Sequence, residues 1–134
     1  MLILKIDRAL EDPVYHQVAD QLRRLVASGD LVPGTALPSV RQLARDLGVN
    51  LNTIARAYRL LEGEGFLVIH DRAGVTVAAP AEEIEYAARA KLLDEMRATL
   101  ARLRQAGVTT DDLMTIVQIE VLALEGGGKE NEDD

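Results

Sequence analysis

The sequence predicts a mainly α-helical fold with a small β-hairpin, and three features of the 134 residues support this. Residues 38–61 read as two short amphipathic helices hinged at Gly48. Two short β-prone segments follow at 66–70 and 75–78. From Pro80 onward, apolar residues again recur every three or four positions, as in a helix. This order predicts a winged helix-turn-helix followed by two C-terminal helices.

The segment before residue 38 is expected to contain a β-prone stretch and one helix. Residues 2–6 are rich in Leu and Ile and are β-prone. Asp12 is expected to cap a helix that has Pro13 in its first turn and stops at Gly29. The apolar positions of this helix repeat at helical spacing and are Val14, Val18, Leu22, Leu25 and Val26.

The helix-turn-helix carries a start signal for each of its helices. Ser39 is expected to cap the first helix, and either Asn50 or Asn52 the second. Gly48 allows the tight turn between them. The inward-facing residues are expected to be Leu43, Ala44 and Leu47 on the first helix and Ile54, Ala57, Tyr58 and Leu61 on the second.

The net charge of −7 is unevenly distributed along the chain. Residues 1–79 carry nine basic and nine acidic residues, whereas residues 80–134 carry six basic and thirteen acidic ones. Within residues 38–61 there are four arginines and one aspartate. Since local charge governs the electrostatic attraction to phosphates, the acidic average does not exclude nucleic acid as a partner.

Composition excludes several other classes of protein. There is no cysteine, and two histidines are too few for a structural zinc site within one chain. Three Tyr, one Phe and no Trp disfavour binding by base stacking. No paired nucleophile and base, phosphate-binding glycine loop or metal-ligand spacing is present, so we expect neither an enzyme nor a cofactor. Without a signal peptide or membrane-spanning run, the protein is expected in the cytoplasm, with no membrane partner.

A series of residues at characteristic spacing runs through residues 9–79. It consists of Tyr15, Leu22-Arg23, Gly29-Asp30-Leu31, Pro33-Gly34, the run from Leu37 to Ala44, Leu47-Gly48-Val49, Asn52-Thr53, Ala57-Tyr58, Leu61-Glu62 and Glu64-Gly65. This series resembles the winged-helix DNA-binding domain of the GntR family of bacterial transcription regulators. The short helical C-terminal part is similar to the YtrA-type branch, in which two helices mediate dimerisation.

The chain is expected to have three regions and a set of DNA contacts. The resemblance implies a DNA-binding domain at 1–79 and a helical dimerisation domain at 80–125, and the Gly-rich, acidic composition of 126–134 predicts a disordered acidic tail. Asn50-Leu51 stands where many family members have a Ser-Arg pair, so that base-reading arginine is absent. The residues expected to contact DNA are Arg41, Asn50, Leu51, Asn52, Thr53, Arg56, Arg59, Arg72 and the wing-tip Gly74.

Alternatives stay open for several of these side chains. Arg41 either contacts DNA or pairs with Asp46 or Asp71. Asn52 either reads adenine or caps its helix. The arginines of the second helix and the wing either contact DNA or lie on a solvated face.

The C-terminal helices are expected to bury their apolar stripes against a second copy of the chain. Gly107 separates them, and Thr110-Asp111-Asp112 begins the second. An intrachain hairpin is the alternative. The residues expected in the dimer interface are Leu92, Met96, Leu100, Leu103, Leu113, Val117 and Val121.

These features together predict a homodimeric, sequence-specific transcription regulator. The expected partner is a double-stranded DNA operator of palindromic sequence, at which the dimer acts as a repressor. No small-molecule effector is inferred. The alternative is a winged-helix module for protein interaction, with the acidic C-terminal half as its contact surface.

Overall fold

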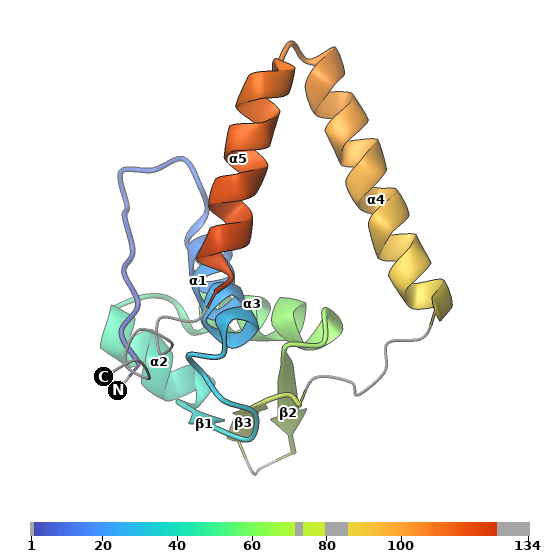
Figure 1. Cartoon of the computed structure of the whole chain (residues 1–134). Helices are drawn as coiled ribbons and strands as arrows, with labels where there is room; N and C mark the ends of the chain where they lie inside the picture. Colours follow the sequence, from blue (N-terminus) through green and yellow to red (C-terminus); the bar gives the residue numbers. More distant parts are fainter. Residues whose placement is uncertain (1, 72–73, 80–85, 126–134) are drawn as a thin grey trace, which may run out of the picture. The chain divides into compact units, whose positions relative to one another are not determined.

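The computed structural model describes residues 2–71, 74–79 and 86–125, and within them it confirms the mainly helical, winged fold. The helices and strands run in the order α1 (Val14–Ser28), β1 (Ala36–Leu37), α2 (Val40–Leu47), α3 (Leu51–Gly63), β2 (Leu67–His70), β3 (Gly74–Val77), α4 (Tyr86–Gln105) and α5 (Thr110–Ala123) (Figure 1). The elements from α1 to β3 form one unit, and α4 with α5 form a second. The tail at 126–134 lies outside the described residues.

The start of α1 differs from the sequence prediction. Pro13, and not Asp12, occupies the N-cap position, and no side chain caps the helix there. Asp12 instead pairs with His16, with 2.8 Å between Oδ1 and Nδ1. The predicted cap was wrong because the side chain of Asp12 has a second partner one turn along, which the local cap signal does not reveal.

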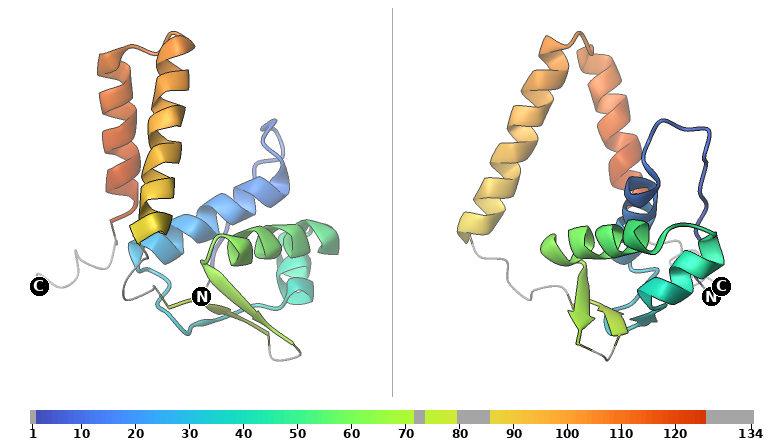
Figure 2. Two further views of the ribbon diagram at one scale, coloured as in Figure 1. Left: turned by 90° about the vertical axis from the view of Figure 1, so that its right-hand side faces the viewer. Right: turned by 180° about the vertical axis from the view of Figure 1, so that it is seen from behind.

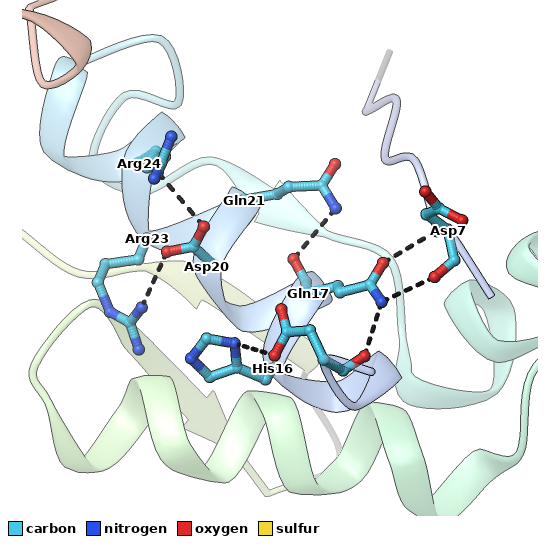
Figure 3. Close-up of polar contacts among 8 residues, drawn as sticks. Asp7, His16, Gln17, Asp20, Gln21, Arg23 and Arg24 are labelled. Carbon is cyan, nitrogen blue, oxygen red and sulfur yellow. Dashed lines mark hydrogen bonds and ion pairs between the residues drawn. The ribbon is translucent and has the colours of Figure 1, made fainter. Parts of the chain in front are cut away.

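The predicted β-stretch at residues 2–6 is also wrong, since no strand forms there. Lys5 of this segment and the following Asp7 bond to glutamine side chains of α1, and Figure 3 shows the contact between Asp7 and Gln17. Gln21 accepts from the Lys5 backbone N–H at 2.9 Å and donates to the Lys5 carbonyl at 2.6 Å. The buried Gln17 amide donates to the carbonyls of Asp7 and Asp12. These side chains therefore satisfy backbone groups that a neighbouring strand would otherwise satisfy.

The core of the first unit is built around the inner face of α3. Ile54, Ala57, Tyr58 and Leu61 have no exposed surface, as the helical spacing predicted. They pack with Val18, Ala19 and Leu22 of α1 and with Leu43 and Ala44 of α2. Leu47, also predicted to face inward, is half-buried against this core.

Two polar contacts tie α3 to its neighbours. The Tyr58 hydroxyl donates to the Pro38 carbonyl at 2.7 Å, just before α2 begins. Burial raises the pKa of the Tyr58 phenol, so this group stays protonated and remains a donor. Directly after α3, Glu64 pairs with the guanidinium of Arg23 from α1 at 2.8 Å. The middle and the C-terminal end of the helix are therefore tied to neighbouring elements.

The wing is a three-stranded antiparallel sheet in the order β1-β3-β2 (Figure 2). The predicted hairpin is present as β2 and β3, each within one residue of its expected bounds. The third strand, β1, pairs Ala36 with Thr76 and Leu37 with Val75. It was not predicted because two residues are too few to show the alternating pattern of a strand.

The second unit leaves much of its apolar surface open. The apolar residues of α4 share one stripe, whereas those of α5 occur around its whole circumference. The two helices diverge from the turn that joins them (Figure 1), and most of their large apolar side chains are exposed, although Leu113 is buried. Within the described residues, none of the helices has the length and apolarity that a bilayer crossing needs.

The turn inside the helix-turn-helix gives a stability prediction with a matched control. Gly48 has a φ of 66° and Gly63 ends α3, and a Cβ at either would meet no atom within 4 Å. We expect Gly48→Ala to lower the free energy of unfolding by about 1 kcal/mol, because a side chain strains the left-handed backbone. Gly63→Ala should raise it by up to about 0.5–1 kcal/mol through lower chain entropy. Urea unfolding measures both, and equal effects would contradict this account.

Candidate nucleic-acid interface

The outward face of the helix-turn-helix begins at two capped helix N-termini. Ser39 caps α2 by accepting the Gln42 backbone N–H at 3.1 Å, as predicted. Of the two candidates for α3, Asn50 is the cap, and its Oδ1 accepts the Asn52 backbone N–H at 2.8 Å. The cap alternative for Asn52 is therefore wrong. The side chain of Asn52 is exposed at the start of α3.

The predicted contact residues on α2 and α3 lie on the side of these helices that faces away from the core. Thr53 is half-buried and Leu51 is 38% exposed. The exposed members of this face are Arg41, Asn50, Leu51, Asn52, Arg56 and Arg59. On α3, the buried stripe and the exposed Asn52, Arg56 and Arg59 follow from one helical repeat, since residues separated by half a turn point in opposite directions. Their role in DNA binding remains a prediction.

The electrostatics of this face differ from those of α1. On α1, Arg23 pairs with Asp20 and Glu64, and Arg24 pairs with Asp20. Across the described residues, by contrast, no carboxylate lies within ion-pair distance of Arg41, Arg45, Arg56 or Arg59. The proposed pairing of Arg41 with Asp46 or Asp71 is thus absent, and Asp46 instead accepts from Gln42 Nε2 at 2.8 Å. The positive charge of this face is not neutralised by neighbours.

The wing provides one further predicted residue that the structure describes. Gly74 starts β3 with a φ of 89° and pairs with His70 of β2. Arg72, the predicted wing-tip arginine, lies outside the described residues. His70 contacts Thr76, with 2.9 Å between Nε2 and Oγ1, as expected of a strand residue.

Two contacts of this region were not predicted from the sequence. Arg8 Nη2 donates to the Gly48 carbonyl at 2.9 Å, which ties the N-terminal segment to the turn between α2 and α3. The Tyr15 ring of α1 lies under the guanidinium of Arg56. Both join residues far apart in the chain, so no periodicity or local motif could indicate them.

With this geometry described, comparisons with known proteins decide the family. The pattern described as "Bacterial regulatory proteins, gntR family" matches residues 14–77. The HTH-type transcriptional repressor YtrA of Bacillus subtilis is 30% identical over 131 residues, which cover 97% of this chain and 100% of YtrA. The chain belongs to the GntR family. It shares the YtrA-like length, and the relatives named here are transcription regulators and not enzymes.

Solved structures extend this likeness. YtrA from Sulfolobus acidocaldarius, a GntR-family transcription factor, is 33% identical with a TM-score of 0.56, and the match covers 88% of this chain and 96% of that one. The DNA-binding domain of AraR in complex with operator ORX1 is 26% identical with a TM-score of 0.50, covering 57% of this chain and 96% of that one. As a GntR protein, the chain is a transcription regulator with a DNA-binding domain.

The cap at Asn50 gives a prediction that separates folding from binding. In Asn50→Asp the carboxylate still accepts the Asn52 N–H, so the free energy of unfolding should change by less than about 0.5 kcal/mol. If this edge faces DNA as predicted, the new negative charge should weaken DNA binding about tenfold at low salt. Urea unfolding and fluorescence anisotropy measure the two effects.

The matched control for this variant is Thr109→Asp. Thr109 accepts the Asp112 backbone N–H at the start of α5, so the change keeps a cap and adds the same charge outside the helix-turn-helix. It should leave DNA affinity unchanged. Equal weakening by both variants would mean that only the net charge of the chain matters.

Proposed function

We propose that this GntR protein is a repressor that binds a palindromic operator as a homodimer, with the outward face of α2 and α3 as its DNA-reading surface. The observation that carries the DNA-reading surface is the absence, among the described residues, of any carboxylate paired with its four arginines. Arginines without carboxylate partners can neutralise phosphates and release counterions, which drives association with DNA.

The roles within this surface follow from geometry. Arg41, in the first turn of α2, is placed for a base edge or a phosphate. Asn50 uses its side-chain oxygen as a cap, which leaves Asn52 as the amide free to read a base. Thr53 donates its backbone N–H to the Asn50 carbonyl at 3.0 Å, so its hydroxyl is the group available to a phosphate. Gly74, and Arg72 beside it in sequence, are proposed for the minor groove.

Dimerisation is supported by the apolar surface of the second unit. Leu92 and Met96 of α4 are 56% and 50% exposed, and Val117 and Val121 of α5 are 41% and 56% exposed. Exposed apolar area of this extent on one unit marks an interaction site. Because α5 is apolar around its circumference, a second copy of the helix pair would cover sides that α4 leaves open. Leu100 is half-buried and Leu113 is only 8% exposed, so these two residues would add less contact area to the dimer interface.

A twofold dimer explains why the operator should be palindromic. An isologous interface presents α3, the proposed recognition helix, twice, with the two copies related by a dyad. The two helices then read half-sites whose centres are separated by about one turn of DNA, roughly 34–36 Å, or a multiple. A repressor of this type blocks a promoter by occupying such a site, and it acts where the DNA lies, which for this family is the cytoplasm.

Selection of bound genomic fragments tests the DNA-binding surface. The wild-type chain should enrich fragments that share a palindromic element. The variant Arg41→Ala with Asn52→Ala should bind that element at least about tenfold more weakly and with a lower salt dependence, because it loses a charge and a base contact.

Arg24→Ala serves as the matched control, since it removes an arginine from α1 and not from the proposed surface. It should keep the affinity within about twofold. If the double variant binds like the wild type, this surface does not read DNA. Enrichment of no sequence at all would favour the module for protein interaction.

The dimer is tested by one charge on the apolar stripe of α4. Met96→Asp should turn the dimer into a monomer at micromolar concentration, because a carboxylate would be buried in the interface without a partner. Ala98→Asp is the control, since it lies about 200° farther around the same helix and is exposed. Sedimentation velocity gives the masses, and circular dichroism checks that both variants fold. A dimeric Met96→Asp variant would place the interface elsewhere.

A further inference from the structure

The guanidinium of Arg56 is stacked on an aromatic ring from another helix. Arg56 Cζ lies 3.7 Å from the centroid of the Tyr15 ring, well inside the range of about 6 Å at which a cation is attracted to a π face. Tyr15 belongs to the first turn of α1, and Arg56 lies in the second turn of α3. The contact therefore joins the start of α1 to the outward face of the recognition helix.

The Tyr15 ring is itself held in place, so it can act as a fixed platform. It is half-buried and packs against the core of the first unit. The edge of the His16 ring faces it, with 6.4 Å between ring centroids and 85° between ring planes. His16 in turn pairs with Asp12 at 2.8 Å. A platform with these supports restricts where the guanidinium of Arg56 can lie.

The stacked pair borders a hollow that also contains predicted DNA contacts. The hollow has a volume of about 400 Å³ and is lined by Pro13, Val14, Tyr15, Asn52, Thr53 and Arg56. Arg56 is exposed, and within the described part of the chain no carboxylate pairs with it. Stacking uses the flat face of the guanidinium and leaves its N–H edge available to an anion. The hollow therefore offers a fixed cation in a site that Thr53 also lines.

We propose that Tyr15 is a positioning residue for DNA binding, which holds Arg56 so that its N–H edge meets a phosphate of the DNA backbone. This rests on the proposed DNA-reading surface. A free arginine side chain loses rotamer freedom when it binds a phosphate, and the stack imposes that loss before DNA arrives. Tyr15 thus raises affinity without touching DNA.

A double-mutant cycle tests this role, with Tyr15→Leu, Arg56→Gln and the combined variant. The probe is a labelled mixed-sequence duplex of about 30 bp, roughly three helical turns, titrated over a range of salt. Arg56→Gln should weaken binding and lower the salt slope by about one per subunit. Tyr15→Leu should weaken binding about two- to fivefold per subunit with the salt slope retained, because all charges remain.

The combined variant decides between positioning and simple packing. If Tyr15 acts through Arg56, Tyr15→Leu causes no further loss once Arg56 is Gln. An equal loss in both backgrounds would mean that Tyr15 only supports the fold, and would overturn the proposal. An unchanged salt slope in Arg56→Gln would do the same.

Tyr15→Phe is the matched control, since it keeps the aromatic face and removes only the hydroxyl. It should bind the duplex within about twofold of the wild type. A loss as large as that of Tyr15→Leu would point to the hydroxyl and contradict the platform role. If the wild-type chain binds no duplex at all, the proposed DNA-reading surface fails, which is distinct from failure of the positioning role.

Discussion

The buried stripe of α3 is the constraint on which the rest of the first unit depends. Ile54, Ala57, Tyr58 and Leu61 have no exposed surface, and the Tyr58 hydroxyl is bonded to the backbone before α2. A helix with one face so fully buried cannot rotate about its axis without exposing that face. Its opposite side is therefore fixed in direction, and the polar and basic residues at its start are presented outward as a consequence of packing.

Charge and apolar surface are distributed differently in the two units. In the first unit the apolar residues close into one core, while the arginines of the helix-turn-helix remain without carboxylate partners in the described residues. In the second unit the helices diverge and leave apolar side chains exposed. The net charge of −7 belongs to the second half of the chain and does not describe the surface at which DNA binding is proposed.

Local signals in the sequence were enough to predict most of the first unit. The helical repeat of α3 identified all four residues of its buried face, and Ser39 and Gly48 marked the cap and the turn. These local signals succeed because caps, turns and one-sided burial depend on residues at most a few positions apart. At the start of α3 two local signals competed, so the sequence allowed either Asn50 or Asn52 as the N-cap, and the structure shows that Asn50 is the cap.

By itself, therefore, the sequence determined the family, the order of the helices and the outward face of α3. Tertiary structure alone decided that residues 2–6 bond to glutamines of α1 and form no strand, and that β1 completes the wing. It also decided that Tyr15 stacks on Arg56 and that α4 and α5 diverge. The hydrogen bonds of residues 2–6, the pairing of β1 and the Tyr15–Arg56 contact each join residues distant in the chain, and spacing along the sequence does not show which distant residues meet. Helical spacing likewise does not fix the angle between two consecutive helices.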